Sequence, residues 1–221
     1  MNGKCLTVLL ISCGSYSQPC GAEPPARETD ARISYYLDSR DFNTATLVAS
    51  TKALPLGMAV WGFADFHSAP ERSSERFDMT RYFIEYRLLR TIEPGWVGGL
   101  QGLGLVAEYN DLEGDNNALV RFGLSYKRPL PCGRVQVRLF PLETDGNGGQ
   151  LAFSYRVDFS HRLSLAGFAD YSLVEGGADR WVAEPQLGYR LNDRFSLLLE
   201  YRYNEFEQND SGVAAGLETL F

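Results

Sequence analysis

The sequence is poor in the residues that most enzymes and metalloproteins depend on, with only two histidines and four cysteines in 221 positions. It has no apolar run long enough to cross a bilayer as a helix, because its one sustained apolar stretch, at the N-terminus, is too short. The formal net charge is −7 and no stripe of Lys or Arg runs along the chain. We therefore expect no metal, no cofactor and no nucleic-acid partner.

The first 22 residues have the layout of a signal peptide for export. Lys4 supplies a positive start, Leu6–Ile11 forms a short apolar stretch, and small residues lead to a predicted cleavage site after Ala22. Two alternatives stay open at this stage. In one, the segment is retained as a disordered or helical N-terminus. In the other, Cys13 is a lipoprotein acylation site.

Cleavage after Ala22 would leave two regions. Residues 23–30 would form a short periplasmic segment, and residues 31–221 would form one folded domain. The mature chain would keep Cys132 as its single cysteine, so no internal disulfide is expected. Cys132 lies in the turn sequence Pro129–Gly133 with no histidine near it, which argues against a catalytic thiol.

From residue 31 onward, polar and apolar residues alternate in segments of about ten, separated by turn signals. In Arg194–Asn204, for example, apolar and aromatic residues occupy one face and mostly polar residues the other. Period-two alternation predicts an all-β fold, a transmembrane antiparallel up-and-down barrel of about twelve strands, with ten as the alternative. The predicted strands are 31–38, 43–51, 57–66, 78–90, 97–109, 117–127, 133–141, 149–159, 162–173, 180–190, 194–205 and 212–221.

The predicted connections alternate between short and long, as in outer-membrane barrels with short periplasmic turns and longer external loops. The short set includes Glu93-Pro94-Gly95, and the long set carries most of the acidic residues. Aromatic residues flank both sets, which is the pattern that the two membrane interfaces select. Gly98-Gly99 predicts a bulge, and Pro185 predicts an irregular strand because proline cannot donate to a ladder.

The last ten residues, Gly212 to Phe221, alternate apolar residues and close on a C-terminal Phe. This pattern resembles the terminal signature of bacterial outer-membrane barrels, which implies recognition of Phe221 by the barrel-assembly machinery. It also implies an outer membrane of lipid bilayer and lipopolysaccharide as the protein's surroundings.

Two short sequence segments, Trp61–Phe66 and Ala183–Leu187, resemble the nucleoside-specific channel-forming (Tsx-like) group. That resemblance implies a channel in the cell outer membrane, and it makes nucleosides the first solutes to test.

Alternation places a mixed set of charges and several rings inside the predicted barrel. We expect the lumen to contact a small-molecule solute through Phe63, Asp65, Phe83, Glu85, Arg121, Arg156, Phe168, Asp170, Glu184 and Arg202. The sequence Gly-Phe-Ala-Asp occurs twice, at 62–65 and 167–170, so rings and carboxylates recur together. Inward glycines, among them Gly123, Gly212 and Gly216, are expected to leave room in the lumen.

These features favour passive diffusion of small polar solutes, without enzymatic activity. In the alternative, the inward charges pair with one another and plug the lumen of a structural or adhesive barrel. A third hypothesis, an outer-membrane hydrolase, depends on His67 with Asp65 and Ser68, since His161 lies in a predicted periplasmic turn. The oligomeric state stays open.

Overall fold

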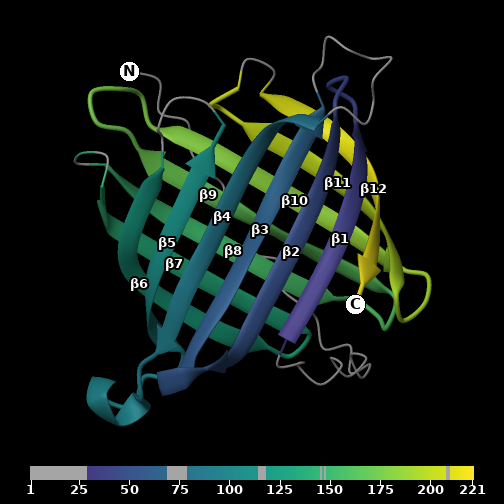
Figure 1. The fold of residues 1–221 in the computed structure, drawn as a ribbon. Coiled ribbons are helices and arrows are strands. Elements are labelled where there is room, and N and C mark those ends of the chain that lie inside the picture. The colour runs from purple at the N-terminus through teal and green to yellow at the C-terminus, as the bar shows by residue number, and fades with distance from the viewer. Residues whose placement is uncertain (1–28, 69–78, 114–117, 145, 147, 208–209) are drawn as a thin grey trace, which may run out of the picture.

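The computed structural model describes residues 29–68, 79–113, 118–144, 146, 148–207 and 210–221. These residues form one closed antiparallel barrel, in which each strand pairs with its sequence neighbours and β1 pairs with β12 (Figure 1). The strands are β1 (Thr29–Asp38), β2 (Asn43–Leu54), β3 (Met58–Ser68), β4 (Met79–Thr91), β5 (Leu103–Leu112), β6 (Leu119–Leu130), β7 (Gly133–Glu143), β8 (Gly149–Asp158), β9 (Leu163–Leu173), β10 (Arg180–Arg190), β11 (Phe195–Asn204) and β12 (Ser211–Leu220). Twelve strands are thus confirmed in the described residues.

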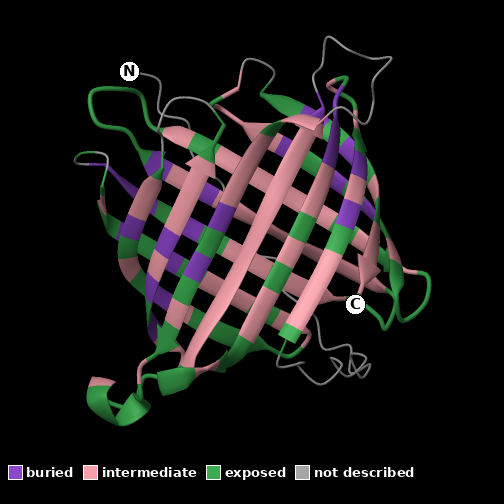
Figure 2. Cartoon of the chain, in the orientation of Figure 1, coloured by how far each residue is buried: buried purple, intermediate pink, exposed green. Residues whose placement is uncertain are grey.

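The alternation in the sequence corresponds to two faces of the barrel wall. In β11, Leu197, Leu199 and Tyr201 are exposed on the outside, whereas the intervening Leu198 and Glu200 are buried inside. Successive residues of a strand point to opposite faces, so each strand divides its residues between the lumen and the outer surface. Figure 2 shows the resulting mixture of exposed and buried positions along single strands.

The outer surface is dominated by exposed apolar side chains. They include Leu105, Leu124, Leu139, Leu151, Leu197, Leu199, Val213 and Leu217. Contiguous apolar surface on this scale is not found on soluble monomers, whereas a bilayer requires it on the outside of a spanning barrel. The chain therefore has the architecture of an outer-membrane β-barrel. Among the described residues, no helix is long and apolar enough to cross a membrane.

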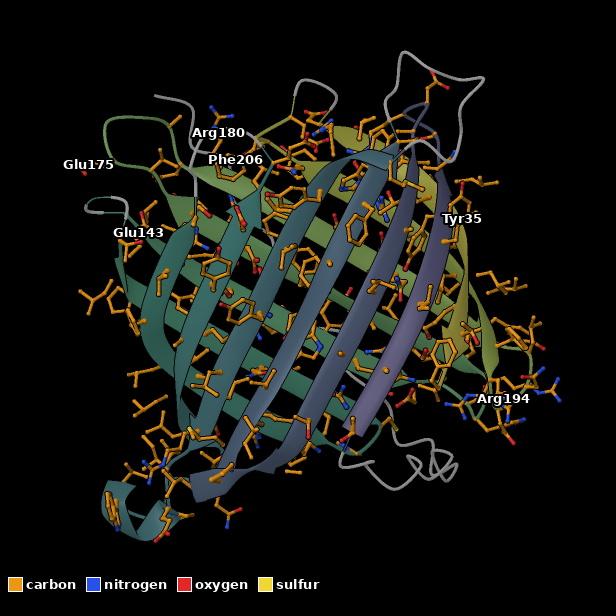
Figure 3. The ribbon with its side chains drawn as sticks, in the orientation of Figure 1. Tyr35, Glu143, Glu175, Arg180, Arg194 and Phe206 are labelled. Carbon is orange, nitrogen blue, oxygen red and sulfur yellow. The ribbon has the colours of Figure 1, made fainter. Side chains whose placement is uncertain are left out.

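Aromatic side chains lie near both ends of the outer surface, as the sequence predicts. Tyr171 packs against Trp181 with ring centroids 4.8 Å apart, near the end that carries the longer loops. At the other end, Phe159 and Phe195 are exposed outside the barrel. Figure 3 shows Arg180, Phe206, Glu143 and Glu175 toward one end and Arg194 toward the other.

The connection between β4 and β5 differs from its prediction. The structure has an eleven-residue link from Ile92 to Gly102 with a 3-10 helix, η2 (Pro94–Val97), where the sequence predicted a tight turn at Glu93-Pro94-Gly95. Gly98 and Gly99 adopt left-handed φ values of 65° and 86°, so they terminate η2 and form no strand bulge. The β2–β3 link similarly contains a short 3-10 turn, η1 (Pro55–Gly57).

The predicted irregularity at Pro185 is confirmed. β10 is paired with β9 through Pro185 and its partner Gly167, but its pairing with β11 skips Glu184 and Pro185. A Cβ on Gly167 would come 2.5 Å from the carbonyl oxygen of Glu184, so only glycine fits opposite this proline without a backbone shift.

The N-terminal predictions fall mostly beyond the described part of the chain. β1 begins at Thr29, two residues before the predicted start of the barrel, and the predicted signal peptide and Cys13 lie outside the described residues. In the full-length chain, Cys132 forms a disulfide bond. The sequence predicted no disulfide for the mature chain, in which Cys132 would be the single cysteine after cleavage.

Candidate functional site

The strand register places all ten predicted site residues on the inner face of the wall. Phe63 and Asp65 of β3 are cross-strand partners of Glu85 and Phe83 of β4, and Phe168 of β9 is the partner of Glu184 on β10. Cross-strand partners project to the same side of a sheet. The remaining members also belong to rungs of inward residues: Arg121 on β6, Arg156 on β8, Asp170 on β9 and Arg202 on β11.

Phe63 and Phe83 form a small aromatic group in the lumen. Their ring centroids are 5.6 Å apart, and Trp61 packs against Phe63 at 5.5 Å. Trp61 also lies beneath the guanidinium of Arg87 at 5.0 Å. Phe168 is half-buried on a different wall and, within the described residues, has no ring contact with this group. The two Gly-Phe-Ala-Asp repeats therefore do not bring their rings together.

One charge network runs along the wall from β4 to β7, and we name it the Glu108 cluster (Glu85, Arg87, Glu108, Arg121 and Glu143). Glu108, only 1% exposed, accepts from Arg87 Nε at 2.6 Å and from Arg121 Nη1 at 2.9 Å. Arg87 also pairs with Glu85 at 2.6 Å, and Arg121 with Glu143 at 3.2 Å. Because these charges are buried, each depends on its partner for stabilisation.

A second network, the Arg202 cluster (Tyr36, Asp38, Arg40, Thr44, Gln186, Glu200 and Arg202), lies near the long-loop end. Arg202 donates to Glu200 at 2.6 Å and to Thr44 at 2.8 Å, and its guanidinium lies over the ring of Tyr36. Asp38 pairs with Arg202 at 3.3 Å and with Arg40 at 2.9 Å. The cluster joins β10 and β11 to β1 and β2 across the closing strand β12.

The inward glycines do not leave open space, so that expectation is wrong. A Cβ on Gly212 would stand 2.8 Å from the side chain of Arg40, and one on Gly216 would stand 2.6 Å from the ring of Tyr36. A Cβ on Gly123 would stand 1.9 Å from the backbone carbonyl oxygen of Leu139 in β7. Side chains of the Arg202 cluster fill the space over β12. At Gly123, the absence of a side chain lets the backbones of β6 and β7 approach each other closely.

Arg156 belongs to neither network. It pairs with Asp158 of its own strand at 2.9 Å, toward the end with the short turns. Asp65 and Glu184 are half-buried carboxylates that face the lumen. Asp65 accepts a hydrogen bond from Thr46, and Glu184 makes no hydrogen bond or ion pair with any described residue. Among the described residues, neither carboxyl has a cationic side chain within ion-pair distance.

His67 does not have the surroundings of a catalytic base. It lies in an inward rung between Thr44 and Arg81, with Nδ1 3.1 Å from the Thr44 hydroxyl. Ser68 is 3% exposed and its hydroxyl accepts the backbone N–H of Asn43 at 2.8 Å. A hydrolase of membrane lipid would need these groups at the lipid-facing surface. In the part of the chain that the structure describes, no three His, Cys, Asp or Glu side chains are grouped to hold a metal.

Sequence reasoning missed several members of both networks, notably Arg87, Glu108, Asp38 and Arg40. Arg87 and Glu108 occupy alternate positions that face inward in their strands. The alternation in the sequence could therefore have identified both as inward. Arg40 lies in the β1–β2 turn, where no alternation exists.

Comparisons with known proteins support the architecture. No family model matches the chain, and no characterised protein matches it in sequence. Among solved structures, the KdgM porin in complex with disordered oligogalacturonate is similar at TM-score 0.56 and 11% identity, with 87% of this chain and 99% of that chain covered.

Two phospholipase structures are similar to the same degree. The Salmonella typhi outer membrane phospholipase dimer with bound calcium has TM-score 0.57 and 14% identity, over 88% of this chain and 90% of that chain. The Escherichia coli outer membrane phospholipase A has TM-score 0.54 and 13% identity, over 88% and 92%. At such identities the likeness shows a shared fold. The chain has the barrel fold of outer-membrane proteins, and the resemblance to the nucleoside-specific group stays a hypothesis.

Proposed function

We propose that the protein is an outer-membrane channel for passive diffusion of small polar solutes, with nucleosides as the first solutes to test. The observation that carries the proposal is the Glu184 carboxylate, which faces the lumen from β10 and has no ion pair or hydrogen bond to any described residue. A charge in a plugged, dry interior would need a partner, since an unpaired buried charge is costly. Glu184 is half-buried, so its side chain keeps some exposure, as a water-filled lumen would require.

The Glu108 cluster is compatible with a solute path because it follows the wall. At the long-loop end, Gln186 of β10 reaches Tyr36 of β1, and Arg81 of β4 lies 4.0 Å from Glu207 of the β11–β12 connection. The Glu108 cluster joins adjacent strands from β4 to β7, and the Arg202 cluster folds over the small residues of β12. Pairing along the wall fixes the side chains without requiring a bridge through the lumen centre. The half-buried rings of Phe63 and Phe83 offer apolar contact area beside carboxylates.

The KdgM porin is a channel with a similar fold, and its structure contains an oligogalacturonate. The phospholipases have the same architecture, but His67, the base on which the hydrolase hypothesis depends, faces the lumen and not the lipid. For biogenesis, we propose export by cleavage after Ala22 and recognition of Phe221 by the barrel-assembly machinery.

Planar lipid bilayers containing the purified protein test the channel. We expect small conductance steps with weak ion selectivity, because opposite charges within a Debye length of about 8 Å cancel much of each other's field. Glu184→Gln should reduce cation preference, whereas Asp193→Asn, at an exposed turn, should not. If folded protein leaves bilayers silent and liposomes containing it do not swell in small sugars or nucleosides, the lumen is plugged and the structural hypothesis replaces this one.

A further inference from the structure

Arg138 and Asp170 lie in one inward rung, separated by a single methyl group. Arg138 of β7 is the cross-strand partner of Ala152 on β8, and Ala152 is the partner of Asp170 on β9. Adjacent strands are about 4.8 Å apart, so two strand spacings, about 10 Å, separate the backbones of the arginine and the aspartate. Ala152 itself is fully buried. An arginine and a carboxylate thus flank a small residue on the lumen wall.

The Arg138 guanidinium has one edge without a partner. Its Nη1 donates to the Ser154 hydroxyl at 3.3 Å, while Nε and Nη2 have no hydrogen-bond partner. Nε–H and one N–H of Nη2 point the same way, and together they form the fork that binds the two oxygens of a carboxylate. Arg138 is only 3% exposed, yet it has no ion pair with any residue that the structure describes, in contrast to Arg87, Arg121 and Arg202.

Two acceptors without partners lie in the same rung as Arg138 and the next one. Asp170 is 8% exposed and its Oδ1 accepts no hydrogen bond. Gln150, the inward residue before Ala152 on β8, is 7% exposed; its Nε2 donates to Ser172 at 3.2 Å and its Oε1 has no partner. Asp170 interacts electrostatically with Arg138 and with Arg87 of β4.

Buried polar atoms in folded proteins are nearly always paired, because leaving them unpaired forfeits their hydration. Arg32 Nε and Glu85 Oε1 also lack a hydrogen bond but belong to ion pairs. The other buried unpaired donors are on Arg138 and the other acceptors on Asp170 and Gln150, within two neighbouring rungs. The donors form a planar fork that favours a carboxylate, and the acceptors favour a group that donates N–H bonds. One positive and one negative side chain make the set neutral, which matches a ligand that carries both charges.

We propose that Arg138, Asp170 and Gln150 form a subsite for a small zwitterion, of which an α-amino acid is the simplest example. The Arg138 fork binds the carboxylate, and Asp170 Oδ1 with Gln150 Oε1 accepts from the ammonium group. This inference rests on the proposed channel, because the solute reaches the subsite through the lumen. The unpartnered atoms are shielded from solvent in the structure, so a solute enters by parting the side chains over them.

Binding to the full-length protein folded in detergent tests the subsite without requiring conduction. In equilibrium dialysis we compare radiolabelled L-alanine, L-alaninamide, which lacks the carboxylate, and L-lactate, which lacks the ammonium group. We expect alanine to bind about tenfold or more tightly than either analogue, since a site built of polar groups rejects a ligand that leaves them unpaired. Arg138→Lys keeps the charge but removes the fork, so alanine binding should fall about tenfold.

Arg194→Lys is the matched control, because Arg194 is exposed just before β11 at the end with the short turns and lies outside the subsite. It should bind alanine as the unchanged protein does. Asp170→Asn gives a second variant, which should lose the preference for alanine over lactate and decides the matter if Arg138→Lys fails to fold.

Equal binding of all three solutes would overturn the subsite. Alanine binding that persists in both Arg138→Lys and Asp170→Asn would also overturn it. Either result would leave water as the occupant. Salt conductance of the same preparation in bilayers separates that outcome from failure of the proposed channel. A conducting protein without alanine preference refutes the subsite alone. A folded protein that is silent in bilayers and gives no liposome swelling refutes the channel.

Discussion

Tyr36 and Gly216 are cross-strand partners at the seam between β1 and β12, and the Tyr36 ring occupies the space over the glycine. A Cβ at position 216 would stand 2.6 Å from the ring and 2.9 Å from the Tyr35 carbonyl. Gly216→Val should therefore destabilise the barrel by about 1–3 kcal/mol, the usual cost of overpacking. Denaturant unfolding followed by gel mobility of unboiled samples measures the loss. Gly95→Ala, where a Cβ has nothing within 4 Å, should have little effect, and equal stability of both variants would contradict the seam packing.

Glu108 holds two buried arginines, so its neutralisation should be costly. Glu108→Gln removes the charge that Arg87 and Arg121 share, and the expected loss is about 3–5 kcal/mol because it leaves buried charge uncompensated. The same unfolding assay measures it. Asp193→Asn in an exposed turn serves as the control, and a Glu108→Gln protein as stable as that control would show that the cluster is hydrated.

Phe63→Ala should weaken block by a permeating solute more than it changes ion conductance. The reason is that a ring offers contact area without charge. The affinity of the blocking solute should fall about two- to tenfold, which corresponds to roughly 0.5–1.5 kcal/mol per aromatic contact. Solute titrations on single channels measure both quantities. Phe153→Ala, which removes a ring from the outer face, should leave block unchanged. A conductance change larger than the change in block would assign Phe63 to the ion path alone.

His67→Ala should leave conduction intact. The ring contributes a hydrogen bond to Thr44 and an edge contact with Phe42 at 5.4 Å, which amounts to about 0.5–1.5 kcal/mol of stability. Bilayer conductance and a lipid-hydrolysis assay on the same preparation measure the two functions. A hydrolytic activity that disappears in this variant would favour the enzyme.

The loop carboxylate of Glu205 should make the long-loop end sensitive to acid. The Tyr203 hydroxyl and then the Trp181 backbone N–H donate to it, at 2.6 and 2.8 Å, and lower its pKa below the ordinary value. A lowered folded-state pKa stabilises the structure above the unfolded pKa of about 4.3, and the contribution is lost as pH falls through the folded value. The protection of the amide hydrogens near Trp181 against exchange, corrected for the pH dependence of the intrinsic exchange rate, should fall on acidification. Glu205→Gln should remove that dependence, and persistence of it would exclude this carboxylate.

The sequence predicted the barrel because alternation is a local signal. In β11 every second residue faces the lumen, so Glu200 and Arg202 were placed correctly without knowledge of their partners. The β4–β5 link was wrong because Pro94-Gly95 has the composition of a tight turn, although the chain uses it to begin a 3-10 helix. Local composition does not distinguish these two uses.

Partners could not be predicted in the same way. The alternation identifies Arg138 and Asp170 as inward, but only the register places them on either side of Ala152. Likewise, the room expected at Gly212 is taken by Arg40, from a turn about 170 residues earlier in the chain. The composition of the lumen follows from the sequence, whereas its free volume depends on long-range pairing.

The seam between the first and last strands also bears on how the molecule is made. Arg32 pairs with Glu218, 186 residues further on, and the Phe221 N–H donates to the Ala31 carbonyl at 3.0 Å. Until β12 has been synthesised, the sheet has two unpaired edges that no bilayer interior can hydrate. Folding must therefore wait for the C-terminal strand, and the contacts that complete it have the highest contact order in the protein. We expect insertion to be slow and cooperative, with a chain that ends before residue 211 held back from the membrane entirely.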